Sequence, residues 1–193
     1  MKIARALILS LVVPVGLAAQ QQPAAKSANV ITDVFRGRTM SLQHNLAQAF
    51  DSIPANKFDY KPTPAQLTIG HIAEHLANDN YFFCDQFGAM KGQRTAEETS
   101  TPDSVKATWA KEKLVTQLKA SFDFCEKAFA QLSDATLTDD VTMSYGGNSR
   151  QVPRVAMVLI HVQDMTDHYS QIANYMRLNG LLPPTALPRG NAH

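Results

Sequence analysis

The chain has 193 residues, of which 45% are hydrophobic and 18% are charged. This length accommodates one domain with a substantial core and is short for two domains. The formal net charge is +1, with neither a basic stripe nor an acidic tail, so charge gives no indication of nucleic-acid binding. Composition argues equally against a disordered chain and against a disulfide-rich scaffold.

Residues 1–19 have the features of a secretory leader. Lys2 and Arg5 form a positive start, an apolar run follows, and small residues precede Gln20. The apolar run is too short for a comfortable membrane span. We therefore expect a cleaved signal peptide, a secreted or periplasmic mature protein and no stable membrane span; the alternative is an uncleaved anchor. Residues 20–29 are small and polar and would form a flexible lead-in.

Two segments in the first half of the chain are predicted to be helical from the spacing of their apolar residues. The first runs roughly from residue 31 to 52 and ends before Pro54. The second runs from about Thr68, a plausible N-cap, to residue 87. The inward-facing residues expected in the first are Val34, Met40, Leu42, Leu46 and Phe50, and those in the second are Ile69, Ile72, Leu76 and Phe83.

Two further helices are predicted in the second half. One runs from about residue 104 to 132, with its apolar stripe at Val105, Trp109, Leu114, Leu118, Phe122, Cys125 and Phe129. The other runs from about residue 152 to 179, with Gly180 as its C-terminal stop. Four helices joined by long crossovers predict an all-α four-helix bundle over residues 30–184, followed by a tail at 185–193.

The two long connections differ in character. Residues 88–102 are polar and link the second and third helices. Residues 133–151 contain Val141, Met143 and Tyr145 in alternation before Gly146 and Gly147, which predicts a short hairpin or turn and not a strand of a sheet.

Cys84 and Cys125 are the only cysteines. In an oxidising compartment they could pair, but both fall in helical segments, so pairing requires that the two helices meet at these positions. The alternative is a pair of buried apolar thiols.

Histidines cluster on two of the predicted helices. In the last helix, His161, Asp164 and His168 are spaced three and four apart and so share one face. His161 and His168 are two turns apart, which is roughly 10 Å along the axis, so they are not expected to bind the same ion. The ligand pair is then either Asp164 with His168 or His161 with Asp164. A third ligand must come from another helix, where His71 and His75 are one turn apart.

At these residues the sequence resembles the DinB-like (YfiT-like) superfamily. The resemblance covers roughly residues 30–184, and three motifs carry it: TIGHIAEHLA from Thr68, HVQDMTDHYSQI from His161, and the ending YMRLNGLLPP from Tyr175. It implies a left-handed up-down-down-up four-helix bundle. It also implies a metal ion held by one histidine of the second helix and two ligands of the last helix.

The resemblance also fixes which residues would be the ligands. In the family's last-helix pattern, two histidines four apart precede a glutamine. With Gln171 as that glutamine, the second histidine is His168 and the first is replaced by Asp164. Ser170 departs from the family as well, since it replaces the common glycine. On the second helix the family's histidine matches His75.

The expected site is therefore His75, Asp164 and His168, with His161 outside the group. Imidazole and carboxylate donors suit a divalent ion such as zinc, nickel, iron or manganese. The main hypothesis is an exported metal-dependent hydrolase or transferase of a small molecule; thiol-dependent transferases and isomerases occur among the relatives. The alternatives are a non-catalytic metal- or ligand-binding protein of the cell envelope and a structural bundle with a degenerate site. A homodimer is compatible with each of these hypotheses, and no nucleic-acid partner is expected.

Overall fold

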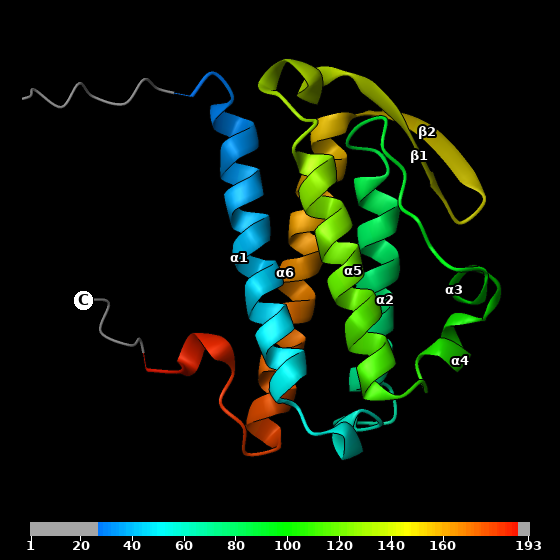
Figure 1. Cartoon of the computed structure of the whole chain (residues 1–193), viewed down its shortest axis with the longest axis vertical. Helices are drawn as coiled ribbons and strands as arrows, with labels where there is room; N and C mark the ends of the chain where they lie inside the picture. Colours follow the sequence, from blue (N-terminus) through cyan, green and yellow to red (C-terminus); the bar gives the residue numbers. More distant parts are fainter. Residues whose placement is uncertain (1–26, 189–193) are drawn as a thin grey trace, which may run out of the picture.

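Four long helices lie side by side in the computed structural model, which describes residues 27–188 (Figure 1). Their bounds are Val30–Ser52 for α1, Ile69–Cys84 for α2, Lys111–Phe129 for α5 and Arg154–Leu178 for α6. Figure 1 shows α2 and α5 running in one direction along the molecule and α1 and α6 running in the other. The predicted leader, nearly all of the lead-in and residues 189–193 lie outside the described residues. Among the described residues, no helix combines the length and apolarity needed to cross a bilayer.

The start of α2 and the ends of α1 and α6 lie where local sequence signals predict them. The Thr68 side chain accepts a hydrogen bond from the His71 backbone N–H at 3.1 Å and so caps α2. Pro54 follows the end of α1, and Gly180 has a φ of 73° directly after α6. These predictions are confirmed to within a few residues.

The predicted third helix is wrong as a single element. It is divided into a short helix α4 (Asp103–Lys106) and the long α5, with residues 107–110 between them. Lys106 is buried and pairs with Glu74 of α2, which ties α4 to that helix. At Gly70 an added Cβ would lie 2.5 Å from the Ala107 carbonyl oxygen, so the connecting segment packs closely on α2. Tertiary contacts therefore break the helix, since no proline or glycine occurs at the break.

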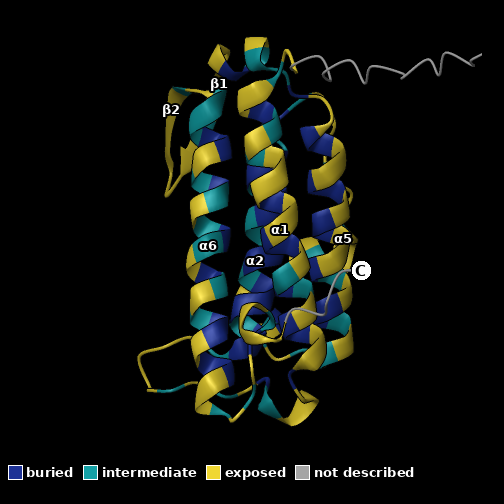
Figure 2. Cartoon of the chain, turned by 90° about the vertical axis from the view of Figure 1, so that its left-hand side faces the viewer, coloured by how far each residue is buried: buried dark blue, intermediate teal, exposed yellow. Residues whose placement is uncertain are grey.

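The predicted apolar stripes are partly correct. Leu42, Leu46 and Phe50 are buried, but Val34 and Met40 are 66% and 45% exposed. In the first half of α1 the buried residues are Thr32 and Thr39 instead, which lie on the same face of the helix as Leu42 and Leu46. Val105 is also exposed, since α4 turns it outward. Figure 2 shows the result, with exposed positions on the outer side of α1 and buried positions toward its neighbours.

The core consists of two apolar clusters, one toward each end of the long helices. On α2 the first cluster ends at Ala77 and the second begins at Tyr81. On α6 the second cluster ends at Val158 and the first begins at Met165. Polar side chains, Asp79 and Asp164 among them, occupy the layer between these clusters. The candidate site lies at the edge of this layer, since His75 and His168 are at the level of the first cluster.

The described chain is not entirely helical, which corrects the all-α prediction. Strands β1 (Asp140–Tyr145) and β2 (Asn148–Pro153) form a two-stranded antiparallel sheet, and Gly146 and Gly147 turn between them with positive φ angles. Of the predicted hairpin or turn, the hairpin is confirmed, but the expectation that the segment contains no sheet strand is wrong. The polar connection 88–102 also contains a short helix α3 (Ala96–Ser100) that was not predicted. Short 3-10 turns lie at Ala55–Lys57, Asp134–Thr138 and Pro184–Ala186.

Cys84 and Cys125 form a disulfide, the first of the two alternatives left open by the sequence. Their Cα atoms lie 5.3 Å apart, where the end of α2 meets α5. The bond therefore cross-links two neighbouring helices next to the polar layer.

Candidate metal centre

Helices α2 and α6 bring His75, Asp164 and His168 together. Each offers one donor atom, and these three atoms lie within 4.8 Å of one another. Asp164 and His168 are one turn apart on α6, with 3.3 Å between Asp164 Oδ1 and His168 Nε2. His75 faces them from α2, with its ring edge-on to that of His168 at a centroid distance of 4.8 Å. The structure thus brings together the three residues that the sequence selects.

The group is buried on one side and accessible on the other. The side chains of His168 and Asp164 are 8% and 17% exposed, whereas that of His75 is 37% exposed. A small molecule would therefore approach from the His75 side.

The donor set fits a divalent ion. Asp164 Oδ2 is buried and has no hydrogen-bond partner, so it is free to bind a cation. Two ligands at zinc-like bond lengths and a tetrahedral angle are separated by about 3.4 Å. The 3.3 Å between Asp164 Oδ1 and His168 Nε2 matches this spacing. On its other side, His168 Nδ1 lies 3.2 Å from Gln171 Oε1, which orients the ring as second-sphere acceptors do in metal sites.

Acidic and basic groups interact strongly here. The pKa of Asp79 is raised to about 6: burial is the largest cause, the imidazoles of His75 and His168 oppose it, and the Asp164 carboxylate adds to it. Burial alone would lower the pKa of His168, but the hydrogen bond and charge of Asp164 outweigh it and the pKa is raised. Two carboxylates in a half-buried layer repel one another, and a divalent cation would relieve that repulsion.

Asp79 is the site residue that sequence reasoning missed. Its Oδ2 lies 3.3 Å from His75 Nε2, one turn further along α2. The signal was present, because His75 and Asp79 have the same i, i+4 spacing as Asp164 and His168.

The remaining histidines of these helices lie elsewhere. His71 lines a separate cleft beside Trp109. His161 is completely buried, and its Nε2 lies 3.8 Å from the sulfurs of both Cys84 and Cys125. The structure therefore separates His161 from the group around His168, as the sequence predicts.

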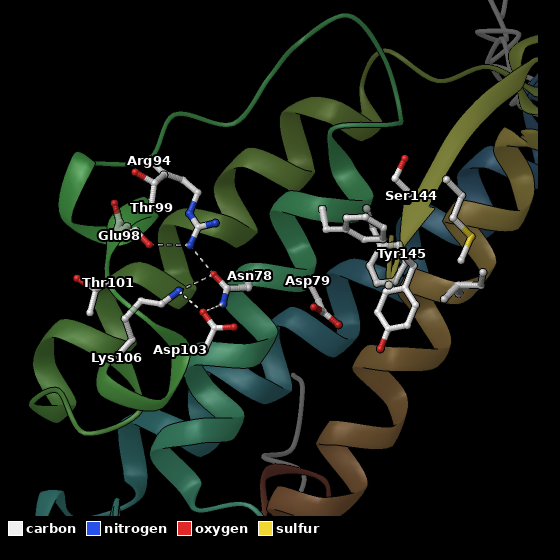
Figure 3. Close-up of a pocket in the computed structure, with 15 residues that line it drawn as sticks. Asn78, Asp79, Arg94, Glu98, Thr99, Thr101, Asp103, Lys106, Ser144 and Tyr145 are labelled. Carbon is white, nitrogen blue, oxygen red and sulfur yellow. Dashed lines mark hydrogen bonds and ion pairs between the residues drawn. The ribbon is translucent and has the colours of Figure 1, made fainter. Parts of the chain in front are cut away.

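A cavity of about 600 Å³ adjoins the candidate site (Figure 3). Asp79 lies on its wall and so connects the histidines with the cavity. One side is closed by the tip of the β1–β2 hairpin, including Tyr145. The other side is polar, with Asn78 accepting hydrogen bonds from Arg94 and, at 3.1 Å, from Lys106. Figure 3 shows Asp79 between this polar group and Tyr145.

Comparison with known proteins identifies the family. No curated protein matched the chain. Among solved structures, a DinB-like protein from Bacillus cereus ATCC 10987 has a TM-score of 0.61 at 15% identity, over 79% of this chain and 95% of that one. A mutant of the mycothiol-dependent maleylpyruvate isomerase has a TM-score of 0.57 at 11% identity, over 74% of this chain and 59% of that one. These likenesses are of fold. The model of the DinB superfamily matches residues 40–172, and the chain therefore belongs to the DinB superfamily.

Proposed function

We propose that this protein is a metal-dependent enzyme that acts on a small molecule in the cavity beside Asp79. The observation that carries the proposal is the convergence of the Asp164 carboxylate with the imidazoles of His75 and His168, together with an Asp164 Oδ2 that is buried and has no hydrogen-bond partner. An unpartnered carboxylate oxygen in a buried layer is costly unless something binds it. A divalent cation is the simplest group that satisfies it.

The residues of the chain have distinct roles in this proposal. His75, Asp164 and His168 would hold the ion, and three protein ligands leave positions open for water or substrate. A bound ion of this kind supplies Lewis-acid polarisation or an activated water. Asp79 Oδ2 lies beside His75 and on the cavity wall, a position from which a carboxylate can act as a general acid or base toward a molecule in the cavity.

We propose hydrolysis or group transfer as the reaction class. The polar wall of the cavity, with Arg94, Lys106 and Asn78, suits a substrate that carries oxygen acceptors. The isomerase of similar fold depends on mycothiol, so a small thiol is one co-substrate to test. A thiol of this kind is mainly cytosolic, however, whereas we propose that this chain is exported.

Two further proposals concern the whole chain. The first is the left-handed up-down-down-up four-helix bundle, which the common direction of α2 and α5 supports. The second is export with removal of residues 1–19, which the Cys84–Cys125 disulfide supports because such bonds persist in oxidising compartments. Intact mass of the native protein tests the second proposal: a mass that retains the leader would rule out cleavage.

Metal content of the oxidised protein, measured by elemental mass spectrometry, tests the function. His75→Ala and His168→Ala should each abolish stoichiometric metal, because each removes one of three donors. Asp164→His should retain metal, since it restores the family's usual ligand. His161→Ala should leave most of the metal in place, and His44→Ala, at an exposed position, serves as the matched control.

Two outcomes would reject the proposal. If the wild type binds no divalent metal under any loading condition, the structural bundle becomes the better description. If metal binds but turnover is absent across ester, amide and thiol-transfer substrates, the chain is a non-catalytic binding protein. Loss of metal in His161→Ala together with retention in His168→Ala would move the site one turn along α6.

A further inference from the structure

A second group of metal-ligating side chains lies in the same structure, apart from the candidate metal centre. Cys84 of α2, Cys125 of α5 and His161 of α6 are each fully buried. His161 Nε2 lies 3.8 Å from both sulfurs, and all three donor atoms lie within 4.8 Å of one another. The function proposed above uses none of these residues.

His161 is an unusual residue for an apolar core. The rings of Phe83, Phe87 and Phe129 surround it, with centroids 5.9, 5.6 and 6.2 Å from its own. Its Nδ1 is buried and has no hydrogen-bond partner, and its Nε2 lies 2.8 Å from Asn80 Oδ1. Burial lowers its pKa to about 4, so the ring is neutral, which is the form that binds metals. A leucine would fill this volume without leaving a polar atom unpartnered.

We propose that Cys84, Cys125 and His161 form a second, buried metal site when the disulfide is reduced. The ligand class is a thiophilic divalent cation such as zinc, since two thiolates and one imidazole are an established zinc donor set. The same three residues thus support two alternative cross-links. The disulfide joins α2 to α5, whereas the cation joins both helices to α6.

The distances allow this exchange with little movement. A zinc-bound sulfur and nitrogen at tetrahedral angle are about 3.6 Å apart, and two zinc-bound sulfurs are about 3.8 Å apart. Both sulfur-to-nitrogen distances in the cluster are 3.8 Å. Only the two sulfurs must separate, which follows from breaking the bond between them. Asn80 Oδ1, beside His161 Nε2, is a candidate fourth donor.

The chemistry balances with a dithiol as the reductant. The dithiol loses two protons and two electrons as its sulfurs join, the protein S–S bond breaks, and each Sγ takes up one proton. Cation binding then releases both thiol protons to solvent as two metal–sulfur bonds form. Because Asn80 Oδ1 can only accept, the single proton of the neutral ring lies on Nε2 in the oxidised protein. Cation binding moves this proton to Nδ1, and the Nε2 lone pair then binds the cation.

Cobalt(II) titration of the full chain without oxygen tests the proposal, because cobalt bound to thiolate has an intense near-ultraviolet charge-transfer band. A water-soluble phosphine reduces the disulfide without adding a competing thiol. The reduced wild type should bind two equivalents of cobalt and show the band, and the oxidised wild type should bind one without it. This comparison needs no substitution, so it remains decisive even if a variant fails to fold.

Variants assign the ligands and separate this site from the first. His161→Asn should lose the band, and Cys84→Ser should lose it as well, with folding checked by circular dichroism. His75→Ala should keep the band while losing the other equivalent, so failure of the proposed function is distinguishable from failure of this inference. A folded, reduced wild type without the band at any cobalt concentration would overturn the proposal. Persistence of the band in His161→Asn would overturn the role of that histidine.

Discussion

The buried ion pair between Glu74 and Lys106 offers a sharp test of how the short helix α4 is held. Lys106 Nζ lies 2.6 Å from Glu74 Oε1, and the two side chains are only 4% and 3% exposed. Burial raises the pKa of Glu74, and the charge of Lys106 opposes that shift. The substitution Lys106→Met keeps the apolar part of the side chain and removes its charge, so Glu74 is left buried without its counter-ion.

The expected loss of stability depends on whether Glu74 stays charged in the variant or takes up a proton. At an effective dielectric constant of about 20, two unit charges 2.6 Å apart attract by about 6 kcal/mol, so Glu74 would not remain charged alone. Protonating it instead costs about 1.4 kcal/mol for each pH unit above its ordinary pKa of 4.5. Unfolding free energy should therefore fall by about 3 kcal/mol at pH 7 and by about 1 kcal/mol at pH 5. The sign follows because the native variant holds a proton that the unfolded chain has released.

Urea unfolding at pH 5 and pH 7, followed by circular dichroism, measures both losses. The control is Lys119→Met, which breaks a pair with Asp51 that has the similar distance of 2.8 Å but is 45% and 51% exposed. Its loss should stay below about 1 kcal/mol at both pH values. The double variant Glu74→Leu with Lys106→Met should recover most of the stability. An equal loss at the two pH values, or less than about 1 kcal/mol at pH 7, would refute the reasoning.

Four further substitutions test local features by the same unfolding assay. Thr68→Ala should cost about 1 kcal/mol, because it removes the cap of α2; no loss would mean that the cap contributes nothing. Gly180→Ala should cost about 1–2 kcal/mol at its positive φ, whereas Gly37→Ala in the open middle of α1 should stabilise by about 0.5–1 kcal/mol. Because the pKa of His161 is about 4 in the folded protein and 6.5 as its ordinary value, the unfolded chain binds more protons between these limits. Stability should thus fall by about 3 kcal/mol from pH 7 to pH 4 through this residue, and His161→Asn should remove that part of the pH dependence.

The parts of the fold that the sequence predicts correctly depend on neighbours in the chain. The Thr68 cap, the stop at Gly180 and the turn at Gly146 and Gly147 each need only a few residues in one conformation. The break after α4 was not predicted, because the contacts made there are with distant residues of α2, namely Glu74 and Gly70. The capping box at Thr95, which starts α3, is a local signal as well, although the segment was predicted to be a polar connection without a helix.

In the candidate site, too, only the features that depend on neighbours in the chain could be predicted from spacing. Spacing along α6 places Asp164 and His168 on one face, but it could not decide between His71 and His75 on the other helix; the family resemblance decided it. The pairing of Cys84 with Cys125 depends on the depth at which α2 and α5 meet, which no pattern within either helix records.

The β1–β2 hairpin lines the cavity but contributes none of the candidate metal ligands. Its tip forms one wall of the cavity, and Tyr145 at that tip is 78% exposed and so contributes little to the core. The histidines and carboxylates lie on helices instead. Under the proposed function, relatives that differ only in the length or side chains of this hairpin would select different molecules while keeping the same metal ligands. Combinatorial replacement of Ser144 and Tyr145, which are exposed and line the cavity, tests this with little effect on the core.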